Sequence, residues 1–209
     1  MTDARRLLLA PLALVLALAV AAARCDSASD GASADDPMAG ARTTSAPLVV
    51  ASLPTADAVR ALYATEAKTP EGAMKVWLTA ALMTASPNLD EHRRGRALLG
   101  ELTLQLQGDP TPWWERNSQT TFADRLNHNA YIFRSYAEGA TPDNGYAMDA
   151  DAWTLAVDSS REDDFDRGWR LAVVSGGADS PRPVYLKQVG ELWYVNEFAN
   201  VYLDIRPAK

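Results

Sequence analysis

The sequence predicts an α+β domain in which N-terminal helices pack on a C-terminal antiparallel sheet. Apolar residues recur at three- and four-residue spacing up to about residue 127, and from Trp153 onward they alternate with period two. Near the C-terminus two apolar runs flank Gly190-Glu191, which is the signal of a two-residue hairpin. Because helices and strands are segregated along the chain, we expect the helices to cover one face of the sheet.

The strongest helix signal covers residues 69–84. Thr69 supplies a capping hydroxyl, Pro70 stands at the first helical position, and Glu71 lies near the positive end of the helix dipole. The apolar face that follows contains Met74, Trp77, Leu78 and Ala81. This spacing predicts a largely buried helix that Pro87 closes.

Three weaker helices are predicted around it, over Ala56–Ala67, from near Asn88 onward, and over Thr121–Asn127. The second of these turns four leucines toward the core, namely Leu98, Leu99, Leu102 and Leu106. Its basic cluster, consisting of Arg93, Arg94 and Arg96 beside Glu91, predicts a solvated helix face.

Three or four antiparallel strands are predicted after residue 152. The apolar runs that predict them are Trp153–Val157, Trp169–Val173, Val184–Val189 and Leu192–Val195. The last two runs resemble the end of nuclear-transport-factor-like or cystatin-like cone folds, which is a likeness of architecture alone.

The N-terminal residues predict export. Arg5 and Arg6 precede an apolar run, Leu7–Ala23, that ends in small residues, so residues 1–24 are expected to be a signal peptide. Residues 25–53 carry no aromatic side chain and are expected to form a disordered tether. All six tryptophans lie beyond Tyr63, which assigns one folded domain to residues 54–209.

Cys25 leaves two processing routes open. The small residues 21–23 fit ordinary cleavage before Arg24, which would release a secreted protein. Cys25 also stands directly after the apolar run, where a bacterial lipoprotein carries its lipidated cysteine, although Arg24 departs from the small residue usual there. Because Cys25 is the only cysteine, lipidation at Cys25 would explain a thiol that has no partner. The expected location is extracytoplasmic, with a membrane-anchored lipoprotein favoured over a soluble periplasmic or secreted form.

The charge of the chain argues against nucleic acid as a partner. The formal net charge is -7, and removal of residues 1–24 leaves about -9. A surface of this sign repels phosphate backbones. Neither a phosphate-binding loop nor a dinucleotide fingerprint occurs, so no cofactor is expected.

Two short motifs carry a resemblance to a known family. They are the run from Gly139 to Tyr146, GATPDNGY, and the run from Ser175 to Pro183, SGGADSPRP. Together with the start of the first strong helix they resemble an uncharacterised family of bacterial extracytoplasmic proteins, a domain of unknown function, over roughly residues 69 to 206. The resemblance implies no activity, ligand or catalytic residue.

No catalytic or metal-binding set is predicted. The chain has two histidines, His92 and His128, and neither stands in a pattern with a nucleophile. His128 follows Asp124 by four residues, so the two are expected to share a helix face. The acidic run from Glu162 to Asp166 could ligate calcium or solvate a loop, but its spacing is not that of an EF-hand.

Two segments are candidate partner contacts. In the loop from Gly176 to Pro183, the glycines permit exposed backbone amides, and Asp179, Ser180 and Arg182 add polar groups. The alternative is a rigid connection in which Arg182 pairs with Asp179. Trp113 and Trp114 are the second candidate, because adjacent side chains of an extended segment cannot both face inward.

The leading functional hypothesis is a non-enzymatic, exported cell-envelope or secreted domain. It would bind an unidentified protein, peptide or small molecule through the sheet face and the Gly176–Pro183 loop. One alternative is a hydrolase or isomerase that uses carboxylates inside a cone-shaped fold, marked by a pocket acid of raised pKa. A second alternative is a structural or assembly protein of the envelope, marked by a flat apolar patch.

Overall fold

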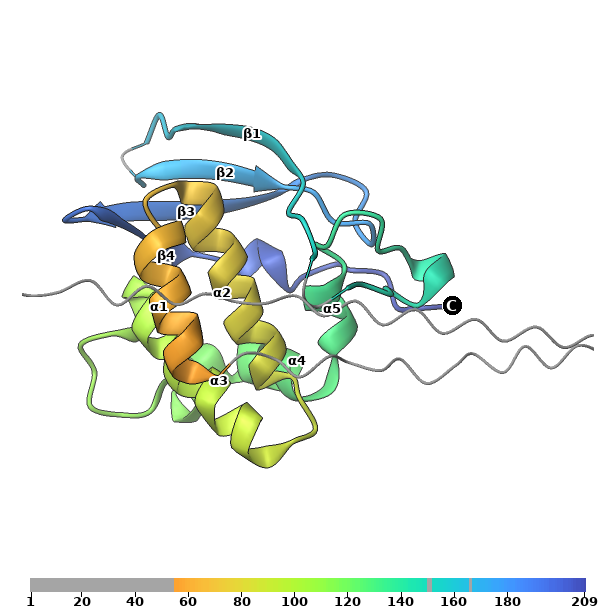
Figure 1. Cartoon of the computed structure of the whole chain (residues 1–209), viewed down its shortest axis with the longest axis horizontal. Coiled ribbons are helices and arrows are strands. Elements are labelled where there is room, and N and C mark those ends of the chain that lie inside the picture. Colours follow the sequence, from red (N-terminus) through yellow and green to blue (C-terminus); the bar gives the residue numbers. More distant parts are fainter. Residues whose placement is uncertain (1–54, 150–151, 166) are drawn as a thin grey trace, which may run out of the picture. The chain divides into compact units, whose positions relative to one another are not determined.

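Helices on one side of a four-stranded sheet make up the computed structural model, which describes residues 55–149, 152–165 and 167–209 (Figure 1). The predicted α+β class is confirmed. The expected signal peptide, the expected tether and Cys25 lie outside the described residues. Within the described ranges, no helix has the length and apolar character needed to cross a membrane.

The first two helices begin where their caps predict. α1 spans Ala56–Glu66, and the Thr55 hydroxyl accepts a hydrogen bond from the Ala58 amide at 3.2 Å. α2 spans Pro70–Thr84, and the Thr69 hydroxyl accepts one from the Gly72 amide at 3.1 Å. From Met74 on, nearly every side chain of α2 is buried, so the predicted buried helix is confirmed.

α3 spans Leu89–Leu102 and packs very closely on α2. Asn88 caps it by accepting from the amides of Asp90 and Glu91 at 3.0 and 3.1 Å. A Cβ at Gly95 would lie 2.3 Å from the backbone nitrogen of Thr84. Only glycine permits this approach, which explains a residue of low helix propensity inside the helix.

A run of short helices connects α3 to the sheet. It consists of η1 (Leu104–Leu106), η2 (Trp113–Glu115), η3 (Asn117–Gln119), α4 (Thr120–His128), α5 (Ala130–Arg134) and η4 (Pro142–Asn144). α4 was predicted, whereas α5, of five residues, was not. Leu106 is buried as expected, but it lies in η1, because the extended backbone of Thr103 ends α3.

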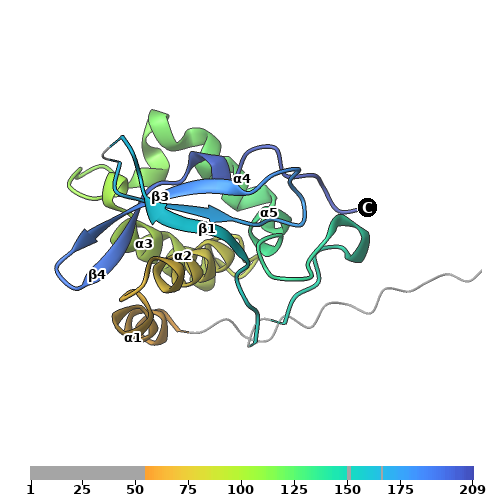
Figure 2. The same ribbon diagram turned by 90° about the horizontal axis from the view of Figure 1, so that it is seen from above.

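The sheet is an antiparallel meander in the order β1-β2-β3-β4, followed by η5 (Ala199–Val201). Its strands are β1 (Val157–Glu162), β2 (Trp169–Val173), β3 (Arg182–Val189) and β4 (Leu192–Glu197). The predicted hairpin at Gly190-Glu191 is confirmed, with Gly190 at a φ of 65°. Seen from above, the strands lie in front of the helices (Figure 2).

The first predicted strand, Trp153–Val157, is wrong in position. β1 begins where that run ends, and only Leu155 of the earlier residues makes an isolated bridge, to Ala137. The reason is that β1 is an edge strand whose middle and end are polar and exposed, so it carries no apolar alternation.

The turn between β1 and β2 is organised by one buried carboxylate. Asp163 accepts hydrogen bonds from the amides of Phe165 and Arg167 at 3.0 and 3.3 Å. The Arg167 guanidinium adds two more, each at 3.0 Å. This guanidinium and the two amides lower the pKa of Asp163.

In the described part of the chain no cluster of three or more acids, histidines or cysteines could hold a metal ion.

We expect Asp163→Asn to lower the thermal midpoint of unfolding in a pH-dependent way. A carboxyl whose pKa is lowered by folding stabilises the protein above its unfolded pKa, and that contribution is lost as the pH falls through the folded value. The difference in midpoint between wild type and variant should therefore be largest near pH 7 and shrink below about pH 4. Asp164→Asn, at an exposed neighbour, is the control. A difference that stays constant from pH 7 to about pH 3 would show that the charge of Asp163 does not stabilise the turn.

Candidate functional site

An open hollow of about 560 Å³ lies between α3 and the segment 106–116, and we call it the α3 depression. Its floor and walls mix apolar surface with guanidinium, amide and carboxylate groups. Its lining includes Arg96, Gly100, Gln107, Asp109, Trp114 and Arg116.

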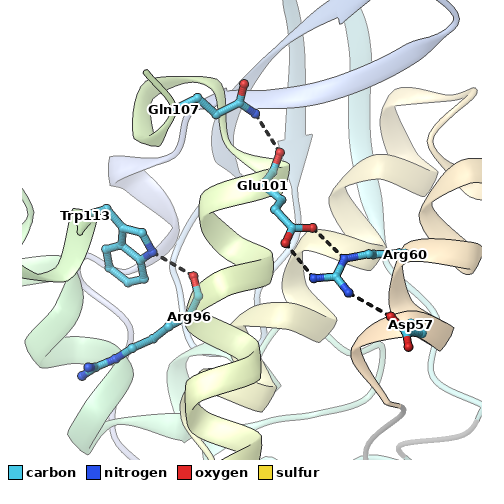
Figure 3. A network of polar contacts seen from close by, with 6 residues as sticks. All are labelled: Asp57, Arg60, Arg96, Glu101, Gln107 and Trp113. Atoms are coloured by element: carbon cyan, nitrogen blue, oxygen red, sulfur yellow. Dashed lines mark hydrogen bonds and ion pairs between the residues drawn. The ribbon is translucent and has the colours of Figure 1, made fainter. Parts of the chain in front are cut away.

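The adjacent tryptophans have separate environments. Trp113 is 3% exposed, packs on Phe122 with ring centroids 5.4 Å apart, and donates its indole N–H to the Arg96 carbonyl at 2.9 Å (Figure 3). A Cβ at Gly100 would lie 3.3 Å from the Trp113 ring, so the glycine leaves room for the indole. Trp114 is only half-buried, and its ring meets Trp113 edge-on at 5.6 Å. One indole thus completes the core and the other borders the depression.

Arg96 covers the ring of Trp114. Its guanidinium carbon lies 5.3 Å from the ring centroid, and its Nη2 donates to the Asn127 side chain at 3.2 Å. Its Nε is buried and has no hydrogen-bond partner among the described residues. Burial lowers the pKa of Arg96, and the charge of Glu115 opposes that shift. The prediction of a solvated face is therefore wrong for Arg96, whereas Arg93 and Arg94 are exposed.

Arg116 holds the loop in shape. Its Nε donates to the Thr111 carbonyl at 2.8 Å, and its Nη2 donates to the carbonyls of Leu106 and Asp109 at 3.0 and 3.2 Å. The Asp109 carboxylate accepts from the Thr111 amide at 2.8 Å, and this bond lowers the pKa of Asp109. The arginine side chain is 14% exposed, and its hydrogen bonds to three carbonyl groups hold the loop in one conformation without a ligand.

A second set of bonds ties the depression to α1. Arg60 donates Nε and Nη2 to the two carboxylate oxygens of Glu101 at 2.8 and 2.7 Å, and its Nη1 donates to Asp57 at 2.9 Å (Figure 3). Gln107 donates its amide to the Glu101 carbonyl at 2.7 Å. The Arg60–Glu101 pair joins α1 to α3, and because both side chains are half-exposed it contributes little to stability.

The Gly176–Pro183 loop is arranged differently from the expectation. The Gly176 amide donates to the Ser135 carbonyl at 2.9 Å and the Gly177 amide to the Ser175 hydroxyl at 3.1 Å, so neither amide is free. Arg182 donates to the Asp204 carbonyl at 3.0 Å.

The polar side chains of this loop do not converge. Asp179 forms an exposed ion pair with Arg206 at 3.2 Å, in place of the expected pair with Arg182, and Ser180 is exposed. Asp179, Ser180 and Arg182 therefore remain a candidate contact only as an ordinary polar surface.

The two sequence motifs pack against each other. A Cβ at Gly176 would lie 1.9 Å from the Ala140 carbonyl oxygen, and one at Gly177 would lie 2.3 Å from the Tyr146 hydroxyl. That hydroxyl donates to the Arg206 carbonyl at 2.6 Å, and the Arg206 amide donates to the Gly177 carbonyl at 2.9 Å. We call residues 139–146, 175–183 and the C-terminal tail 203–209 the motif unit.

Both motifs lie inside the stretch that a family model matches, residues 53–209. The chain belongs to the family described as Domain of unknown function (DUF6935). No curated protein and no solved structure matches the chain. The expected membership of an uncharacterised domain family is confirmed, and the DUF6935 match carries no statement about activity, source or location.

The sequence did not predict the hydrogen bonds that hold the loop of the α3 depression. Arg116 was not singled out, because its partners are loop carbonyls that leave no pattern in the sequence. The two histidines lie elsewhere: His128 bonds to Asp124 at 3.1 Å, as predicted, and is largely exposed, while His92 contacts the carbonyl of Thr84.

We expect Gly176→Ala to destabilise the domain by about 2–3 kcal/mol, because the added methyl group meets backbone that cannot move without opening the motif unit. Equilibrium urea denaturation measures the change. Ser180→Ala is the matched control, since its side chain is exposed in the same loop. Equal midpoints for the two variants would mean that the close approach to Ala140 does not stabilise the fold.

Proposed function

We propose that this chain is an exported, tethered binding protein whose folded domain recognises a protein, peptide or small-molecule partner in the cell envelope or outside it. In this proposal residues 1–24 direct export and residues 25–53 hold the domain away from its anchor. The rigid α3 depression is the contact that we favour over the Gly176–Pro183 loop.

The preorganised rim of the depression supports this choice. Trp114 and Arg96 form a flat, partly exposed surface, and Arg116 fixes the loop that presents it. Aromatic and arginine side chains dominate the energy of recognition surfaces. A loop that is already rigid loses little conformational entropy when a partner binds.

The carboxylate-dependent hydrolase or isomerase has less support. A general acid in a pocket needs a raised pKa, whereas Asp109 at the α3 depression has its pKa lowered by the Thr111 amide. Asp163 is shifted the same way by Arg167. The structural or assembly alternative calls for a flat apolar patch, which the mixed lining of the depression does not provide.

Lipid attachment at Cys25 is the anchor that we favour, and Cys25→Ala tests it. In a bacterial host, the wild-type chain should appear in the membrane fraction, with an intact mass that begins at Cys25 and includes acyl groups. The variant should appear in a soluble fraction. A wild-type chain that begins at Arg24 without lipid would replace the anchor by free secretion, and an uncleaved cytosolic chain would contradict export.

A photoreactive amino acid at Thr111, on the rim of the depression, tests the binding surface. Irradiation in the exporting host should give a crosslinked product that is absent when the same group replaces Arg94 on the exposed face of α3. Trp114→Ala should reduce the yield about tenfold, as expected for an aromatic anchor. Identical products at both positions, or a yield that the Trp114 variant leaves unchanged, would exclude the depression as the contact.

A further inference from the structure

The face of the sheet turned away from the core carries a row of cations. Leu171, Val173 and Val184 point into the core, so their alternate neighbours point outward. On that outer face Arg161 of β1 lies directly opposite Arg170 of β2. Arg170 in turn lies opposite Tyr185 of β3. Figures 1 and 2 show no helix over this side of the strands.

A third guanidinium joins this row from the turn. Gly168 has a φ of 102°, which breaks the alternation of the strand and lets Arg167 reach the outer face. Its guanidinium carbon lies 4.0 Å from the centroid of the Tyr185 ring. Asp163 fixes it there with the two side-chain hydrogen bonds already described. Arg161, Arg167 and Arg170 around Tyr185 are hereafter the arginine row.

The arginine row is not required by the fold. Like charges directly opposite each other on neighbouring strands destabilise a sheet. Arg161 has a partner in Asp164 at 3.0 Å, but both side chains are largely exposed. Within the described ranges, the Arg170 guanidinium has neither an ion pair nor a hydrogen bond.

The surroundings of the row add both signs of charge. Lys187 is exposed two residues along β3 from Tyr185, on the same face. Glu197 lies opposite Tyr185 on β4. The cations of this face therefore extend from β1 across β2 to β3, in a chain whose formal net charge is -7.

We propose that the arginine row binds an extended, carboxylate-rich segment of a partner protein. An extended peptide that crosses the strands suits the row, because two strand intervals of about 4.8 Å make about 9.6 Å, and alternate side chains of the peptide lie about 7 Å apart. The long side chains of arginine and glutamate span the remaining difference. Two carboxylates at that spacing can each accept hydrogen bonds from a guanidinium. This surface belongs to other elements than the α3 depression, so it goes beyond the proposed function.

Charge favours a peptide over an anionic membrane as the occupant. A bilayer surface would meet the whole negative field of the chain, including Asp164 and Glu197 on this face. A short peptide meets only the charges near it, since salt screens charges beyond about 10 Å. Among these, the cations Arg161, Arg167, Arg170 and Lys187 outnumber the carboxylates Asp163, Asp164 and Glu197.

Fluorescence anisotropy with a labelled peptide in which glutamate alternates with serine tests the proposal. The purified chain should bind this peptide more tightly than a peptide with glutamine at the same positions, and binding should weaken as salt rises. The double substitution Arg161→Gln with Arg170→Gln should reduce affinity about tenfold. Its thermal midpoint should equal or exceed that of wild type, because a like-charge pair is removed.

Arg94→Gln is the matched control, since it removes an exposed arginine from α3, and it should leave the affinity unchanged. Equal affinity for the two peptides, or an unchanged affinity in the double variant, would overturn the proposal. Cosedimentation of the chain with anionic phospholipid vesicles, without binding of the peptide, would also overturn it and assign the row to membranes. None of these results bears on the α3 depression, so the two proposals fail separately.

Discussion

The burial of Trp77 is the constraint on which the rest of the domain depends. Its side chain has no exposed surface, and its indole N–H donates to the Thr103 hydroxyl at 2.8 Å, where α3 ends. Its ring lies 6.0 Å from that of Phe122 in α4 and 5.4 Å from that of Phe198, which follows β4. One side chain of α2 therefore contacts a second helix, a third helix and the end of the sheet. The position of α3, and with it the depression, follows from this contact and from the close approach at Gly95.

Much of this architecture could be predicted, because its signals are local. The Thr69 cap and Pro70 mark the start of α2, and Gly190 marks the last hairpin, since each position needs a particular backbone geometry. β1 could not be placed, because an exposed edge strand has no apolar alternation. The fold class and most helix and strand boundaries thus followed from hydrophobic periodicity and capping residues, whereas the position of the edge strand β1 did not.

The site was less predictable than the fold for a physical reason. Trp113 is buried and Trp114 is half-buried because adjacent side chains point in different directions, and the sequence indicated this difference. The groups that fix the depression act on backbone carbonyls, as Arg116 does, and any residue supplies a carbonyl. Arg96 stands near two exposed arginines in the sequence, and its contacts with Trp114 and Asn127 distinguish it from them in the structure. The recognisable motifs, in contrast, proved to be rich in packing glycines and poor in free polar groups.

The motif unit also joins parts of the chain that are distant in sequence. Its three parts come from the middle of the chain, from the connection after β2 and from the last residues, where Lys209 donates its amide to the Pro142 carbonyl at 3.0 Å. These contacts span large distances in sequence, and non-local contacts of this kind slow folding because loop-closure entropy opposes them. The Tyr146 hydroxyl therefore reaches its acceptor at Arg206 only when residues 203–209 have docked against Gly177. Closing the motif unit consequently costs the loop entropy of the two intervening stretches, residues 147–174 and 184–202, in addition to the entropy of ordering each part.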